Sequence, residues 1–281
     1  MKKFLLILLA SAAISPAMAQ TYQTYNYGVP AQRTRQPVVQ AQAKRAKAPE
    51  KYKIGNPLYH LSAQSSIIGG EMRYAIVPKT TSHAKSDAWD ITPDIDFGIT
   101  DKLSVHGFAR YGRSEVKSNP GKGTKLFSYE AQAGLKYLIA SVDDFDFNIN
   151  ADIFYTKSRT RIGAARRNNH TSGTNVGLQV GKKIENITPY FSVGFTSDFW
   201  SKKGSAAGTN TVINPGVYID LTEQVSLNLS YESVVHQIAT YKGVVDFYPQ
   251  NNIAIGVGAY IAHPTTDLDM YGALANIKVK F

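Results

Sequence analysis

The chain has 281 residues, a net charge of +10 and no cysteine, and 43% of its residues are hydrophobic. The lack of cysteine excludes a disulfide framework and cysteine-ligated zinc. The 17 tyrosines and 12 phenylalanines exceed ordinary usage, and such residues suit the two aromatic girdles of a membrane β-barrel.

Residues 1–19 are typical of a secretory signal peptide. Lys2 and Lys3 form a short basic region, residues 4–13 are an apolar run, and residues 17–19 form an A-x-A cleavage site. The apolar run is too short to cross a membrane as a helix, and no later stretch reaches about 18 apolar residues. The sequence therefore predicts an exported protein whose mature chain begins at Gln20.

Residues 20–55 are predicted to form a disordered basic tail in the periplasm. They are rich in Gln, Ala, Pro, Arg and Lys and have almost no periodic apolar residues. Residues 20–53 carry seven basic residues against Glu50, a net charge of +6, whereas residues 54–281 carry only +2. Because the basicity belongs to the tail, it does not indicate nucleic-acid binding. The tail is either a solvated linker or an arm that contacts an anionic surface or partner.

From residue 56 onward, apolar and polar residues alternate with a period of two, which is typical of strands whose faces meet different surroundings. The end of the chain shows this clearly, because Ile277, Val279 and Phe281 alternate with Lys278 and Lys280. Strands are predicted at residues 66–77, 88–99, 103–115, 125–140, 145–158, 173–182, 187–201, 211–221, 225–234, 241–248, 253–262 and 269–281.

The weak stretch 241–248 decides the number of strands. Without it there are eleven, and a chain that starts on the periplasmic side would end outside. Bacterial single-chain barrels have even strand numbers and periplasmic termini. We therefore predict an all-β fold, a transmembrane antiparallel up-and-down β-barrel of about 12 strands over residues 56–281, with 10 strands as the fallback. A soluble sandwich or soluble barrel is the alternative, and it predicts shorter strands with fewer aromatic ends.

Short and long connections alternate along the predicted barrel, as in outer-membrane barrels. Short turns are predicted near residues 101, 142, 185, 223 and 250, longer loops near 82, 121, 166 and 205, and intermediate ones near 238 and 266. Basic residues occupy the longer loops, namely Lys79, Lys85, Lys117, Lys122, Lys125, Arg161, Arg166, Arg167, Lys202 and Lys203. They form either a solvated rim or a contact with lipopolysaccharide phosphates.

Three motifs carry a resemblance to a known family. They are Asn56-Pro57-Leu58-Tyr59, the strand-turn-strand pattern of residues 97–105, and the terminal Phe281. With the signal peptide, they make residues 56–281 similar to the small opacity-type outer-membrane β-barrel proteins, which are porin-like proteins of Gram-negative bacteria. The resemblance implies an integral outer-membrane protein folded by the barrel assembly machinery, which reads the C-terminal strand. It implies no functional residues, because that family shares no common active site.

Charged residues that should face the lumen are concentrated in the first strands. Opposite charges on neighbouring strands can pair across the ladder, and pairing is what permits charges in a narrow lumen of low dielectric. The candidate cluster is Glu71, Arg73, Asp90, Asp94, Asp96, His106, Arg110, Glu130 and Lys136. It is either a salt-bridged network that fills the barrel or a charged pathway for small polar solutes or ions.

Two further arrangements could carry chemistry. His170, Ser172 and Asn175 are the residue types of outer-membrane Ser-His-Asn lipases, but they lie in or beside the predicted loop 161–173 and not on facing strands. Asp94 and Asp96 could ligate calcium, but no glycine-containing ligand loop surrounds them. We therefore predict no enzyme activity, no cofactor and no metal.

The sequence favours a monomeric outer-membrane barrel with a structural or surface-interaction role. The alternative is a narrow channel or porin for small polar solutes or ions. Outer-membrane lipid, lipopolysaccharide and the barrel assembly machinery are the expected partners, and nucleic acid is not.

Overall fold

The computed structural model describes residues 51–79, 85–116, 124–162, 165–201, 209–234, 238–265 and 268–281. The predicted signal peptide and residues 20–50 of the predicted tail lie outside these ranges. Across the described ranges, no helix combines the length and apolar character needed to cross a membrane.

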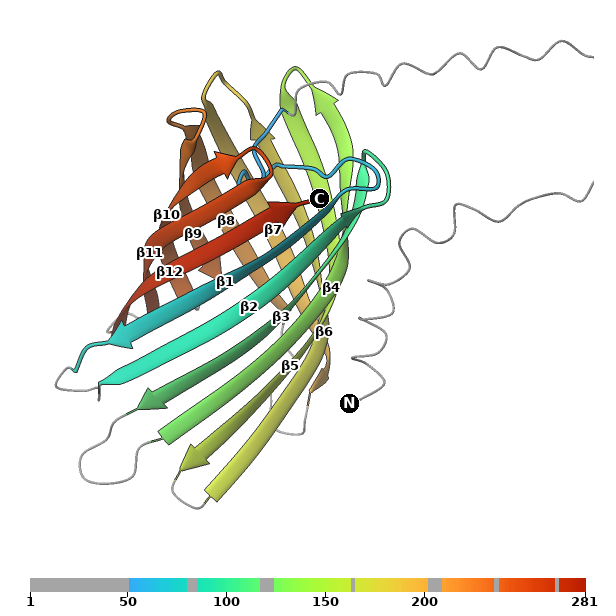
Figure 1. Ribbon diagram of the computed structural model, residues 1–281. Coiled ribbons are helices and arrows are strands. Elements are labelled where there is room, and N and C mark those ends of the chain that lie inside the picture. Colours follow the sequence, from blue (N-terminus) through green and yellow to red (C-terminus); the bar gives the residue numbers. More distant parts are fainter. Residues whose placement is uncertain are drawn as a thin grey trace, which may run out of the picture. The chain divides into compact units, whose positions relative to one another are not determined.

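Twelve antiparallel strands form one closed barrel (Figure 1). The strands are β1 (Ser66–Val77), β2 (Ser86–Gly98), β3 (Leu103–Val116), β4 (Thr124–Val142), β5 (Phe145–Ile162), β6 (Ala165–Lys182), β7 (Ile187–Ser201), β8 (Thr209–Asp220), β9 (Val225–Val234), β10 (Ile238–Gln250), β11 (Ile253–Thr265) and β12 (Leu268–Lys280). Each strand pairs with its neighbours in the chain, and β1 pairs with β12 to close the ring. The predicted fold and the number twelve are confirmed.

Side chains alternate between an apolar outer face and a more polar lumen. The weak stretch in β10 follows the rule, because Val245 and Phe247 are exposed on the outside whereas Asp246 and Tyr248 are buried inside. Ile68 and Met72 of β1 are likewise more than half exposed. An alternating strand of this kind can hold one face against lipid and the other against a polar interior.

Five short turns lie at one end of the barrel, which is also where β12 ends (Figure 1). They span residues 99–102, 143–144, 183–186, 221–224 and 251–252, close to the predicted positions. Two of them have two residues, 143–144 and 251–252. In the first, Asp143 and Asp144 have φ angles of 50° and 68°, the left-handed backbone that two-residue hairpins favour. We call the end of the barrel that carries these five turns the short-turn end.

The predicted loop at residues 161–173 is wrong. β5 continues to Ile162 and β6 begins at Ala165, so most of that segment is a paired hairpin. The prediction failed because these residues are polar on both faces, and a strand that extends beyond an apolar environment loses the alternation that reveals it. β4, β5 and β6 have 18 or 19 residues each. At the far end the β5–β6 hairpin extends beyond β7, since the last residue of β7, Ser201, pairs with Thr171 (Figure 1).

Candidate functional site

Residues 51–65 precede β1 and enter the lumen at the short-turn end (Figure 1). They belong to the same compact unit as the barrel. We call them the plug segment. Residues 51–55, which are predicted to end the disordered tail, are instead packed against the barrel, with Tyr52 and Ile54 buried.

An apolar core joins the plug segment to the barrel wall. The plug segment contributes Tyr52, Ile54, Leu58, Tyr59 and Leu61, and the wall contributes Ile67, Tyr190, Tyr218, Tyr248 and Ala254. Each large side chain that is fully buried in this way stabilises the packed state by about 1.5–3 kcal/mol relative to exposure. Such a core removes these apolar side chains from water at this end of the lumen.

Two tyrosine hydroxyl groups of the wall bond to each other inside this core. The hydroxyl oxygens of Tyr218 and Tyr248 are 2.6 Å apart, and Ser226 donates to Tyr248 over 3.3 Å. A buried hydroxyl group needs such a partner, because burying it without a hydrogen bond is costly. The aromatic lining is therefore compatible with full burial.

Lysines fasten the plug segment to the rim of the barrel. Lys51 Nζ lies 3.0 Å from the Asp146 carboxylate, and Lys53 Nζ lies 3.0 Å from the Asp220 carboxylate. Each also donates to a turn carbonyl, Lys51 to Asp144 over 3.1 Å and Lys53 to Thr222 over 2.7 Å. The two lysines thus bind two different short turns.

A lysine of the wall holds the centre of the plug segment. Lys136 of β4 points inward and donates to the carbonyl oxygens of Pro57 and Tyr59, each over 3.1 Å. Closer to β1, Gln64 N–H donates to Gly98 O, and Gly98 N–H donates to Ser65 O. The plug segment is therefore bonded to the wall along its whole length.

Glycine is required where the plug segment approaches the wall most closely. A Cβ atom at Gly98 would collide with the carbonyl oxygen of Ser62, and one at Gly181 would collide with the Leu58 side chain. A backbone oxygen cannot move aside as the end of a flexible side chain can. Gly98 is therefore the more restrictive of the two positions.

Two titratable groups of the plug segment are shifted toward their neutral forms. Burial raises the pKa of Tyr52, and the neighbouring Asp146 carboxylate adds to the shift. Burial lowers the pKa of His60, and the Lys136 ammonium group acts in the same direction. Both shifts favour the uncharged forms of these two side chains.

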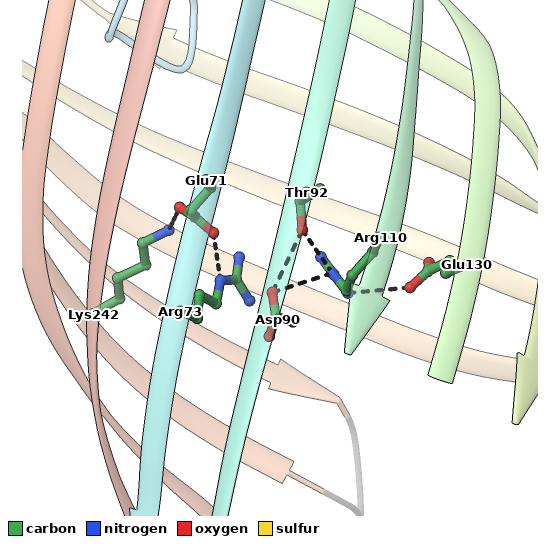
Figure 2. Close-up of polar contacts among 7 residues, drawn as sticks. All are labelled: Glu71, Arg73, Asp90, Thr92, Arg110, Glu130 and Lys242. Atoms are coloured by element: carbon green, nitrogen blue, oxygen red, sulfur yellow. Dashed lines mark hydrogen bonds and ion pairs between the residues drawn. The ribbon is translucent and has the colours of Figure 1, made fainter. Parts of the chain in front are cut away.

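Charged side chains form a row across the wall in the middle of the lumen (Figure 2). This charge row consists of Lys242, Glu71, Arg73, Asp90, Arg110 and Glu130, with Thr92 beside it. Glu71 accepts from Arg73 on its own strand and from Lys242 Nζ over 3.1 Å. Since Lys242 lies on β10 and Glu71 on β1, this bond spans the seam where β1 meets β12.

Arg110 is the centre of the other half of the charge row. Its Nη1 lies 3.1 Å from Glu130 Oε2, and its Nε donates to Thr92 Oγ1 over 3.3 Å. Asp90 lies 3.9 Å from the same Nε and directly opposite Arg73 in the strand register. Every carboxylate of the charge row thus has a cationic neighbour, which offsets the cost of removing it from water.

The nine candidate lumen residues do not form a single cluster. Five of them join the charge row, and Lys136 holds the plug segment. His106 Nε2 lies 2.6 Å from Asp152 Oδ1 on β5, and Asp96 stands opposite His106 in the register. Asp94 lines a cavity of about 260 Å³ together with Asp246 and Lys278.

Sequence reasoning missed the plug segment and its aromatic receptor. The available signal was apolar residues at inward positions close to the short turns, such as Tyr218 and Tyr248. A second signal was the group of apolar residues between Tyr52 and Leu61, ahead of the first strand. Both groups of residues are unusual, because the lumen-facing positions of an outer-membrane barrel are normally polar.

The residues considered for catalysis or metal binding are not brought together. His170 and Ser172 lie on β6 opposite Lys157 and Tyr155, on the outer face, because Tyr155 is exposed there. Asn175 has the opposite parity and donates into the lumen to Gln132 over 3.4 Å. Within the described part of the chain, no three His, Asp or Glu side chains are arranged to hold a metal ion.

Solved structures share this architecture, although no family model and no curated protein match the chain. The translocator domain of the autotransporter NalP from Neisseria meningitidis is 13% identical, with a TM-score of 0.52, over 81% of this chain and 92% of that chain. The transport unit of the autotransporter AIDA-I from Escherichia coli is 8% identical, with a TM-score of 0.56, over 78% and 91%.

The beta domain of the Bordetella autotransporter Brka is 11% identical, with a TM-score of 0.50, over 76% of this chain and 98% of that chain. These neighbours are outer-membrane β-barrels. At such low identities the likeness establishes the fold and nothing about activity.

Proposed function

We propose that this protein is a monomeric integral outer-membrane barrel with a structural or surface-interaction role, and that its own plug segment closes the lumen. The observation that carries the proposal is the apolar core between the plug segment and the wall. The apolar outer face supports the membrane location, because a closed barrel satisfies its backbone hydrogen bonds without water. The short-turn end and the basic tail would then face the periplasm.

The opacity-type family is the family that we propose for this barrel, with the barrel assembly machinery as its folding partner. Residues 97–105 support the family, since they form the end of β2, a short turn and the start of β3. We also propose that the protein is not an enzyme. The outward position of Ser172 supports this, and detergent-activated lipase activity should be absent from both the natural protein and Ser172→Ala.

Conductance across a planar bilayer tests the closed lumen. Mature protein refolded from residue 20 onward is expected to give no reproducible unitary steps. Regular steps from the natural protein would overturn the proposal. Refolding would be verified first by the heat-sensitive electrophoretic mobility of the barrel.

A narrow channel for small polar solutes or ions is the second candidate. The polar cavity beside the charge row favours it, because this space lies between charged groups of both signs. If the natural protein conducts, Arg110→Ala should change the conductance or the ion preference, since it removes the central cation of the charge row. Unchanged conductance in that variant would exclude the charge row as the pathway.

A further inference from the structure

Basic side chains gather on the outer face of β3, β4, β5 and β6, at the end opposite the short turns. The outward parity follows from the register, in which exposed Tyr129 is opposite Lys157, Phe127 opposite Arg159, and Lys125 opposite Arg161. We call the set the cationic face, and its members are Arg113, Lys125, Lys157, Arg159, Arg161 and Arg166.

The cationic face begins where the apolar belt ends. Along β5 the outward residues are apolar from Phe145 to Tyr155, and the next outward residue is Lys157. Ten residues of strand rise about 33 Å, which at the usual barrel tilt gives about 25 Å of height. That height matches the apolar band of an outer-membrane barrel, so Lys157, Arg159 and Arg161 fall at the level of the lipid headgroups.

The charge of this face is only partly balanced by carboxylates. Glu115 lies 2.8 Å from Arg113 and 3.7 Å from Lys125, and Asp87 is opposite Glu115 in the register. Further along the hairpin, Arg159 donates to the neutral side chain of Asn168 over 3.3 Å. Six cations against two carboxylates leave this wall with an excess of positive charge.

Among the described residues, the opposite wall lacks this concentration of cations at the same height. There the outward residues past the belt include Tyr241, His263 and Asp269, and His263 Nδ1 lies 2.7 Å from Asp269 Oδ1. The rings of Tyr241 and His263 are 6.0 Å apart. Within the described part of the chain, the excess of positive charge at this height therefore lies on the wall formed by β3 to β6.

We propose that the cationic face binds the phosphate groups of lipopolysaccharide in the outer leaflet. The inference rests on the proposed membrane location, which puts the end opposite the short turns outside the cell. Lysine and arginine suit phosphate, because their N–H groups form charge-assisted hydrogen bonds with its oxygens. Because the β5–β6 hairpin continues past the apolar belt, Lys157, Arg159 and Arg161 can lie beside the headgroups.

The test measures binding of lipid A to refolded full-length mature protein in a neutral detergent, with fluorescent bisphosphorylated lipid A as the probe. The natural protein is expected to bind it more tightly than fully dephosphorylated lipid A, and less tightly as sodium chloride is raised. The triple variant Lys157→Gln, Arg159→Gln, Arg161→Gln should lose affinity on the order of 100-fold. Charge-preserving exchanges at these positions, Lys157→Arg, Arg159→Lys and Arg161→Lys, should retain it.

The matched control is Lys102→Gln with Lys182→Gln, which removes two exposed or half-exposed cations at the short-turn end and should bind like the natural protein. Equal binding of both lipid A forms would overturn the inference, as would a triple variant with unchanged affinity. If the triple variant does not fold, the inference is tested on the natural protein alone, by whether its binding of lipid A requires the phosphates and weakens as sodium chloride is raised. A barrel that fails to insert into vesicles instead contradicts the proposed function, so the two failures are distinguishable.

Discussion

The short-turn end of the lumen and its middle differ in chemistry. At the short-turn end, tyrosine and aliphatic side chains of the wall enclose Leu58 and Ile54 of the plug segment. In the middle, the charge row lies along the wall beside a cavity of about 260 Å³. Apolar packing removes water and fills space, whereas paired charges satisfy one another and leave room. Closure is therefore assigned to the plug segment, and the charge row supports the wall.

The largest effect on closure is expected from a substitution that leaves a cavity in the apolar core. Leu58→Ala should weaken the attachment of the plug segment by about 2–5 kcal/mol, because it leaves a cavity in a packed core. Unitary conductance steps should then appear in planar bilayers. Ile153→Ala is the control, since Ile153 lies on the outer face and is 63% exposed. A closed Leu58→Ala barrel would contradict the assignment of closure to this core.

A smaller effect is expected where polar groups hold the plug segment. Lys136→Met removes the donor to the carbonyls of Pro57 and Tyr59 and should cost about 1–3 kcal/mol of attachment. Trypsin cleavage after Lys51 and Lys53, followed by mass spectrometry, should become faster. Lys102→Met, at an exposed turn, should leave the cleavage rate unchanged.

A substitution in the charge row should lower the stability of the barrel wall and leave the plug segment attached. Arg110→Ala leaves Glu130 without its cation and should lower the free energy of unfolding by about 1 kcal/mol, a value reduced because the site is partly solvated. Urea denaturation of the refolded barrel measures this change. Faster trypsin cleavage of the plug segment in Arg110→Ala would show that the two regions are coupled.

Acid should loosen the plug segment mildly. The pKa of His60 in the folded protein lies below its usual value of 6.5. The free energy that neutral His60 contributes to the attachment of the plug segment is therefore fully present above pH 6.5, and it is lost as the pH falls through the lowered pKa. The pKa of Tyr52 is raised, so the free energy that its neutral form contributes is fully present below the usual tyrosine pKa of 10 and is lost only at higher pH. Lys136 and Asp146 are the charged groups that act on His60 and should carry part of the response.

Bilayer recordings at about pH 5 should therefore show occasional openings that are absent near neutral pH. His60→Gln cannot take up a proton and should remove the acid response. Openings that persist in this variant would assign the response to another group.

The strands could be predicted because lipid and lumen impose a period of two on every residue between them. Phe281 outward and Lys278 inward are enough to set the frame of β12, and parity then requires β10. The hairpin beyond Tyr155 was not predicted, because both its faces are polar and its sequence shows no alternation. The charge row was predicted only in part, since Lys242 reaches Glu71 across two intervening strands, a contact that adjacent-strand reasoning does not consider.

The plug segment could not be predicted for a different reason. Its backbone forms no ladder, so no periodicity marks it, and its partners Tyr190 and Tyr248 lie more than a hundred residues further along the chain. Apolar residues ahead of a first strand are also compatible with a linker. Only the closed barrel brings these residues together.

The most direct test of closure uses the absence of natural cysteine to place one thiol at a time. Ala254→Cys puts a thiol on the lumen wall beneath the plug segment, where Ala254 is 1% exposed, and Ala63→Cys puts one at an exposed position. A membrane-impermeant maleimide should label the folded Ala63→Cys barrel quickly and the Ala254→Cys barrel only after denaturation. Equal labelling of the two folded proteins would contradict a lumen closed by residues 51–65.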